Sequence, residues 1–141
     1  LFAPLTPRDE EEAAALQKAL VVPNDRRIWA VFRALERGWM VEQIHELTRI
    51  DPWFLRQFAE LVELKRSASL VEARDLSPDL LKTLKRAGFG DEELGEVFGV
   101  DGRFIFERRA EADVQGAYKR IDTCAAEFEA ITPYYYSTYE R

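Results

Sequence analysis

Residues 37–55 read RGWMVEQIHELTRIDPWFL, and this stretch says most about the fold. Gly38 suits the left-handed conformation in which many helices end. A short helix over 41–48 is predicted next, because apolar residues recur there at helical spacing: Val41, Ile44 and Leu47. Asp51 followed by Pro52 is typical of a helix N-cap with proline at the first helical position. The stretch therefore predicts a helix end, a short helix, a turn and a new helix.

A similar pattern returns 50 residues later. The paired positions are Gly38 and Gly88, Trp39 and Phe89, Glu42 and Glu92, Ile44 and Leu94, Glu46 and Glu96, Leu47 and Val97, Ile50 and Val100, Asp51 and Asp101, Phe54 and Phe104, and Leu55 and Ile105. We interpret them as an internal structural repeat, although chance similarity between amphipathic helices is an alternative. The repeat predicts positive φ at both glycines and burial of both aromatics that follow them.

Further helices are predicted on either side of these segments. The first covers 8–20 and has four acidic residues near its start, where the helix dipole favours negative charge. Asn24 or Asp25 caps the second, whose apolar residues follow the 3.6-residue period: Ile28, Val31, Phe32 and Leu35. Ser77 with Pro78 opens another helix, which runs through several leucines.

The helix that begins at Pro52 has an apolar face too broad for a simple surface helix. Its apolar residues are Trp53, Phe54, Leu55, Phe58, Leu61, Val62 and Leu64. We therefore expect this helix to be central to the packing of the protein.

The last part of the chain, 113–141, has a different composition. All five tyrosines lie there, among threonines and a proline, which favours extended chain over helix. We predict two short strands, near 118–122 and 134–139. We also expect Tyr118 and Phe128 to be buried and the second strand to be more exposed.

The predicted fold class is all-α, with an irregular C-terminal segment that contains short strands. One domain spans 1–141, and it holds a first helical repeat over 25–75 and a second over 76–112. An extended segment over 113–141 leads to whatever domain follows.

Composition and charge exclude several classes of protein. The chain has 141 residues, of which 47% are hydrophobic, and a net charge of -6. A folded chain of this length hides about 68–70% of its unfolded surface, which is enough for one core or two small ones. Apolar runs are too short for a membrane span, and none of the segments 1–24, 25–75, 76–112 and 113–141 is net positive, which argues against nucleic acid. The single cysteine favours a reducing, cytoplasmic setting.

Residues that carry chemistry are few, and we predict no catalytic, cofactor-binding or metal-binding residues. His45, with Glu42 one turn away, is more simply a partly exposed helix histidine than an acid–base pair. Cys124 has no nearby His or Lys to lower its pKa, so a packed thiol is favoured over a nucleophile. An acidic set lies on predicted helices and not in a calcium loop: Glu42, Glu46, Asp91, Glu92, Glu93 and Glu96. The glycines from Gly88 onward follow no strand, so they do not predict a phosphate loop.

The paired short helices also invite comparison with helix-turn-helix DNA readers. A recognition helix beginning at Pro52 would direct Trp53, Phe54 and Phe58 toward DNA. These side chains are better explained as core. A helical adaptor that binds protein or DNA is kept as the alternative function.

Three stretches carry a family resemblance. They are NDRRI at 24–28, the fold-deciding stretch 37–55, and above all YKRIDTCAAEF at 118–128 together with YSTY at 136–139. In these stretches the chain strongly resembles the oligomerization, or connection, domain of the large chain of carbamoyl phosphate synthetase. The resemblance covers nearly everything from Pro23 to Glu140.

The resemblance implies a noncatalytic structural and oligomerization domain between two related ATP-grasp halves of the large chain. In this family the first half forms carboxyphosphate and then carbamate, and the second phosphorylates carbamate to carbamoyl phosphate, with ammonia from a glutaminase chain. ATP and magnesium belong to those halves, so no cofactor is expected here. The implied partners are the two synthetase halves, the glutaminase chain and further copies of the chain, with no nucleic acid or membrane.

One position departs from the family pattern. Met40 stands where family members commonly have a small hydroxyl residue that caps the short helix. Losing such a cap costs about 0.5–2 kcal/mol. The sequence therefore leaves the N-terminus of the helix over 41–48 without its usual cap.

Overall fold

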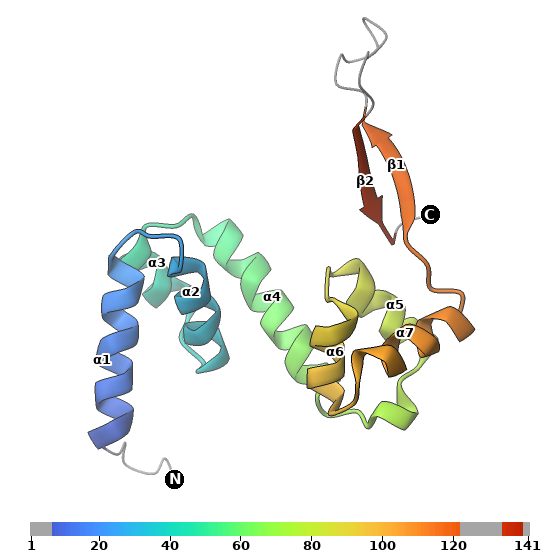
Figure 1. Cartoon of the computed structure of the whole chain (residues 1–141). Helices are drawn as coiled ribbons and strands as arrows, with labels where there is room; N and C mark the ends of the chain where they lie inside the picture. Colours follow the sequence, from blue (N-terminus) through green and yellow to red (C-terminus); the bar gives the residue numbers. More distant parts are fainter. Residues whose placement is uncertain (1–6, 122–133, 140–141) are drawn as a thin grey trace, which may run out of the picture. The chain divides into compact units, whose positions relative to one another are not determined.

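The computed structural model describes residues 7–121 and 134–139, and these are mostly helical, as predicted (Figure 1). The elements are α1 (Pro7–Val21), α2 (Arg27–Glu36), α3 (Val41–Thr48), α4 (Pro52–Ala68), a 3-10 turn η1 (Ala73–Asp75), α5 (Pro78–Arg86), α6 (Asp91–Phe98), α7 (Gly102–Glu111), β1 (Ala117–Ile121) and β2 (Tyr134–Thr138). The chain forms two compact units, Leu1–Leu64 and Lys65–Arg141, and each is described by itself. No helix in the described ranges is long and apolar enough to span a bilayer.

The first unit has an aliphatic core built from α1, α2, α3 and the start of α4. The side chains least exposed to solvent are Leu20, Val31, Ala34, Ile44 and Leu55. Burying one such leucine or isoleucine is worth about 1.5–3 kcal/mol. These contacts account for the periodicity that predicted the helices, because the buried residues are those at helical spacing.

The connection from α2 to α3 has the predicted glycine turn. Gly38 has a φ of 82°, and its N–H donates to Leu35 O at 2.9 Å. The Trp39 N–H donates to Ala34 O at 3.0 Å, so the last carbonyl groups of α2 are satisfied by the turn. The positive φ is confirmed, but Trp39 is only partly buried against the core.

Helix α3 begins at Val41 despite the missing hydroxyl cap. The Met40 N–H donates to Oε1 of Gln43 at 2.8 Å, so a side chain inside the helix supplies the acceptor. At the other end Arg49 takes the left-handed conformation, with a φ of 58°. The bounds predicted for this helix are therefore confirmed.

Two expectations about the first unit are wrong in detail. The N-cap of α2 is Arg26, and Asn24 instead accepts the Arg26 N–H at 2.8 Å in the turn before the helix. We expected α4 to be central to the packing, and this is wrong for the first residues of the helix. Trp53 and Phe54 are 57% and 52% exposed, because only the side of the helix that bears Leu55 faces the core.

The second unit also has a capped helix that ends in a glycine turn. Ser77 caps α5 by accepting the Leu80 N–H at 3.2 Å, as predicted. Gly88 has a φ of 100°, and the Phe89 N–H donates to Leu84 O at 3.2 Å. The core consists of Leu76, Leu81, Leu84, Phe89, Leu94, Ile105 and Val114.

Element bounds in the two units correspond at a shift of 50 residues. Helices α3 and α6 occupy 41–48 and 91–98, and α4 and α7 begin at 52 and 102. Each long helix opens after an aspartate that accepts the N–H two residues on, Asp51 from Trp53 and Asp101 from Arg103. These matches favour the internal repeat, which stays a prediction until the two units are superposed.

The C-terminal segment forms an antiparallel hairpin of β1 and β2, close to the two predicted strands (Figure 1). Tyr118 pairs with Ser137, and Ile121 with Tyr134. The expected burial of Tyr118 is wrong, since this residue is 78% exposed on a sheet that, among the described residues, has two strands. Exposure of the tyrosines in β2 is confirmed. Phe128 and Cys124 lie outside the described residues.

Candidate functional site

A cluster of three charged side chains joins the helices of the second unit. Lys85 on α5 is 5% exposed, and its Nζ donates to Oδ1 of Asp91 and to the carbonyl of Phe89, both at 2.7 Å. The other carboxylate oxygen of Asp91 accepts a hydrogen bond of 2.9 Å from Nε of Arg109, which lies on α7. The carboxylate of Asp91, at the start of α6, thus links three helices.

The pKa of Asp91 lies below its ordinary value. Partial burial by itself would raise this pKa, because it disfavours the charged form. The hydrogen bonds from Lys85 and Arg109, together with their positive charges, outweigh burial and lower it. The carboxylate is therefore ionised at neutral pH, as the cluster requires.

The end of the C-terminal hairpin is anchored beside this cluster. The Nζ of Lys85 lies 5.2 Å from the centre of the Tyr139 ring, which is a cation–π distance. Nε of Arg86 donates to Tyr139 O at 3.3 Å. The cluster therefore holds both the helices of this unit and the last described residue of the chain.

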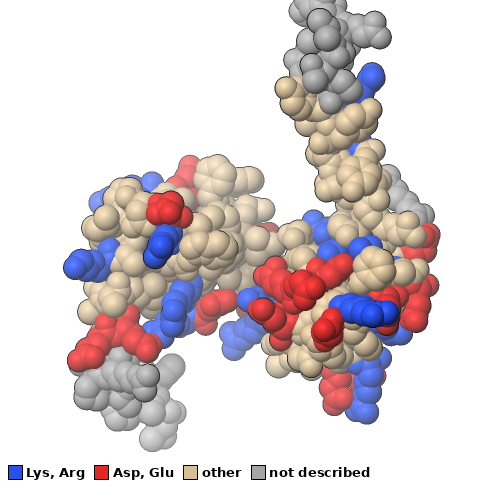
Figure 2. Space-filling view, viewed as in Figure 1, with Lys and Arg blue, Asp and Glu red and all other residues tan. Residues whose placement is uncertain are grey.

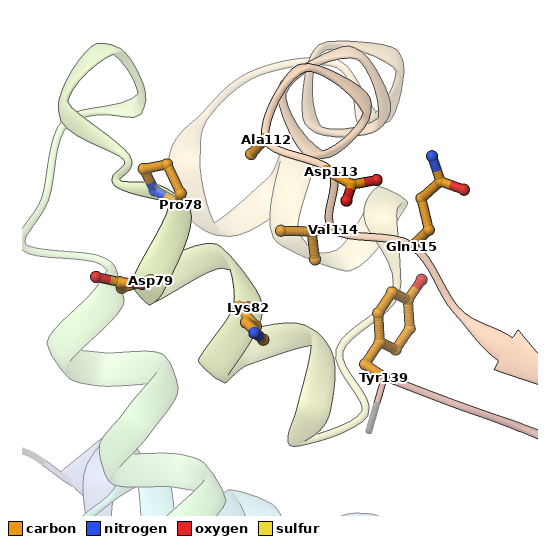
Figure 3. A pocket seen from close by; sticks show the side chains of 8 residues that line it. All are labelled: Pro78, Asp79, Lys82, Ala112, Asp113, Val114, Gln115 and Tyr139. Carbon is orange, nitrogen blue, oxygen red and sulfur yellow. The ribbon is translucent and has the colours of Figure 1, made fainter. Parts of the chain in front are cut away.

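A shallow hollow lies between α5 and the segment that follows α7. Figure 3 shows Tyr139 at one side of it, with Asp79 and Lys82 on the helix. Asp113 and Gln115 supply further polar lining, and the described lining residues include no His or Cys. Carboxylates and a lysine without a nucleophile or a histidine give no basis for assigning a reaction to this hollow.

Three side chains considered for catalysis or metal binding, those of His45, Asp91 and Glu92, lie against other parts of their own unit. Nδ1 of His45 is 2.7 Å from Ile50 O, so the ring fastens the turn after α3. The Glu92 carboxylate lies against Gly102 at the start of α7, where the helix dipole favours it. Within the described ranges, no three His, Cys, Asp or Glu side chains are grouped so that they could hold a metal ion.

The first unit has five neighbouring aromatic side chains on α2 and α4, of which Trp29, Trp53 and Phe54 are exposed and the other two half-buried. The ring centres of Phe32 and Phe58 lie 5.1 Å apart, which joins the two helices. Trp29 lies one turn from Phe32 on α2, and Phe54 one turn from Phe58 on α4. The ring of Trp53 contacts that of Phe54 edge-on at 4.9 Å. We call these five residues the aromatic face.

Sequence comparison decides the family. A sequence model of the carbamoyl-phosphate synthetase large chain oligomerisation domain matches residues 2–113. The chain belongs to this family. The match ends just after α7, so it covers the helices and leaves the hairpin outside.

Relatives extend the likeness into the hairpin. The N-terminal section of the carbamoyl phosphate synthase large chain from Methanopyrus kandleri is 41% identical over 143 residues, covering 93% of this chain and 25% of that protein. The corresponding section from Aquifex aeolicus is 38% identical over 99% of this chain and 24% of its own length. The large chain of Agathobacter rectalis is 45% identical over 88% of this chain and 11% of its own. The chain therefore spans a quarter or less of these relatives.

Membership in the oligomerisation-domain family implies self-association within a carbamoyl phosphate synthase complex. The assignment agrees with the expectation of a noncatalytic domain of that large chain. Sequence reasoning missed two features of this domain. The ionic cluster could have been suspected from Lys85 and Asp91 on either side of a glycine turn. The sequence pattern predicts Trp53, Phe54 and Phe58 in the core, because aromatic residues at helical spacing usually lie there.

Proposed function

We propose that this chain is a noncatalytic domain through which a carbamoyl phosphate synthase large chain self-associates and by which its two synthetase halves are connected. The observation that carries the proposal is the family match over residues 2–113. The relatives support a place inside a larger protein, since a matching stretch forms only 11–25% of their length.

The remaining chemistry is assigned to other parts of the large chain. We infer that the parent enzyme makes carbamoyl phosphate from bicarbonate, glutamine-derived ammonia and two ATP, in the cytoplasm. ATP and magnesium then bind the synthetase halves, and the glutaminase chain is a partner of the assembled enzyme. We also propose one domain over 1–141 with an extended segment over 113–141, and the end of the family match at residue 113 supports a change in the chain at that point.

No observation favours the DNA-binding alternative. The helix that would enter a groove, α4, begins with Trp53 and Phe54, both more than half exposed. A recognition helix needs polar and basic side chains that reach base edges and phosphates. Aromatic rings at this position are instead suited to contact with protein.

Two measurements on the 141-residue chain test the proposed function. Sedimentation velocity over a wide concentration range should show a monomer in equilibrium with a dimer or larger species. Calorimetric titration with ATP and magnesium should give no binding heat. A strict monomer up to millimolar concentration contradicts self-association, and saturable ATP binding contradicts the noncatalytic role.

A further inference from the structure

The aromatic face leaves three large rings of the first unit more than half exposed. Trp29 is 70% exposed, Trp53 57% and Phe54 52%, while Phe32 and Phe58 link them across two helices. Isolated exposed apolar residues are common on protein surfaces, but contiguous ones mark sites of interaction. Figure 2 shows surface without Lys, Arg, Asp or Glu over the first turns of α4.

The matching positions of the second unit show that this face is not a requirement of the helical fold. At a shift of 50 residues, the five aromatic positions correspond to Asp79, Lys82, Arg103, Phe104 and Arg108. Four of these five are charged, and the same helices fold without the aromatic rings. Phe32 and Phe58 pack within the first unit, whereas Trp29, Trp53 and Phe54 are left available for contact with something outside it.

We propose that the aromatic face is the surface by which this domain docks permanently against another folded domain of the same large chain. This inference rests on the proposed function. The relatives carry most of their length outside the matching stretch, so a partner surface is tethered to it. A tethered partner is present at an effective concentration in the millimolar range, which keeps the face covered at any protein concentration.

The composition of the face agrees with a permanent contact. Obligate interfaces are more apolar than transient ones, and tryptophan is among the residues that dominate their binding energy. A second copy would cover the face only above the dissociation constant, and would leave two tryptophans in water below it. A partner in the same polypeptide removes that difficulty.

Hydroxyl-radical footprinting read by mass spectrometry tests the proposal, because the oxidation rate of a side chain follows its exposure. The samples are the 141-residue chain and a full-length large chain carrying this sequence, both diluted until sedimentation shows monomers. Trp29 should be oxidised about tenfold more slowly in the large chain, since residues at the centre of an interface are almost fully desolvated. Leu70, 84% exposed in the other unit, is the internal reference.

A charged variant identifies the surface responsible. In the large chain, Trp29→Glu should raise the oxidation rate of Phe54 toward its value in the short chain, while Leu70→Glu, the matched control, should not. Circular dichroism of both variants in the short chain checks the fold, which is expected to be unchanged because both side chains are exposed there.

Three outcomes overturn the proposal. One is equal oxidation of Trp29 in the two monomeric proteins. Another is protection in the short chain that grows with concentration, which would assign the face to a second copy. The third is continued protection of Phe54 in the Trp29→Glu large chain. Failure of self-association in sedimentation would contradict the proposed function but would leave the footprinting difference intact.

Discussion

The segment α2–α4 of the first unit and the segment α5–α7 of the second unit have similar turns and apolar cores, but they differ in one part of the helix packing. At three matching positions the first unit is aliphatic and the second is ionic: Leu35 and Lys85, Val41 and Asp91, and Ala59 and Arg109. Glycines with positive φ and aspartate N-caps occur in both segments. The comparison shows that turn chemistry determines the path of the chain, while the filling of the interior varies.

The turn between the short and the long helix differs in a related way. In the first unit, Nδ1 of the His45 ring is hydrogen-bonded to Ile50 O at 2.7 Å. In the second unit, Gly95 stands at the matching position, and the Val100 N–H donates to its carbonyl at 2.8 Å. A side chain closes one turn and a backbone hydrogen bond closes the other.

The largest effect is expected from breaking the ionic interior. Asp91→Ala leaves Lys85, 5% exposed, without its carboxylate, and breaking a buried pair in this way costs about 3–5 kcal/mol. Val41→Ala, the matching change in the first unit, should cost less because it uncovers no charge. Urea unfolding of both variants measures the difference, and equal losses would contradict it.

A triple replacement sharpens the same comparison. Lys85→Leu with Asp91→Val and Arg109→Ala places the interior of the first unit into the second. Because it removes all three charges together, stability should change little or rise, as for other buried ion clusters replaced by apolar groups. Loss of stability as large as that of Asp91→Ala would show that the two interiors are not interchangeable.

The next most harmful change should be the addition of a side chain at Gly95, beside the turn between α6 and α7. A Cβ at Gly95 would lie 2.7 Å from Val100 O and 2.9 Å from Gly102 N, both backbone atoms. Gly95→Ala should therefore lose about 1–3 kcal/mol. Gly90→Ala is the control, since nothing lies within 4 Å of a Cβ there. The same substitution is made at both glycines, and only the room for a Cβ atom differs. Equal unfolding midpoints for Gly95→Ala and Gly90→Ala would therefore disprove the steric argument.

The glycine stops should give smaller and nearly equal effects in the two units. Gly38 and Gly88 have φ values of 82° and 100°, and neither has an atom within 4 Å of a built Cβ. Replacement of either by valine should cost about 1–2 kcal/mol from backbone conformation alone. Chemical denaturation of the two variants measures this, and a loss in only one unit would argue against a shared turn.

The smallest effect is the pH dependence contributed by the ionic interior. The pKa of Asp91 is lower in the folded protein than its ordinary 3.8. Its contribution to stability is therefore present above pH 3.8 and is lost as the pH falls through the lowered folded value. The stability difference between the wild-type chain and Asp91→Asn should shrink in that acid range. A difference that stays constant would show that the Asp91 charge does not stabilise the fold.

Much of the fold could be predicted because its signals are local. Gly38, Asp51 and Ser77 each fix a helix end through the backbone conformation of one residue or a hydrogen bond to a neighbour. The family could likewise be inferred from a contiguous stretch, residues 118–128. The complete ionic cluster could not, because Arg109 joins the Lys85–Asp91 pair only after three helices have packed.

By itself, the sequence determined the order of the helices, several of their ends, the glycine turns and the family, since each depends on residues that are close along the chain. Only the tertiary structure decided which aromatic residues are buried. Trp53, Phe54 and Leu55 are adjacent and equally apolar, yet only Leu55 is fully buried. The reason is physical: burial depends on which side of a helix meets another element, and that direction is set by the packing of α4 on the core of the first unit.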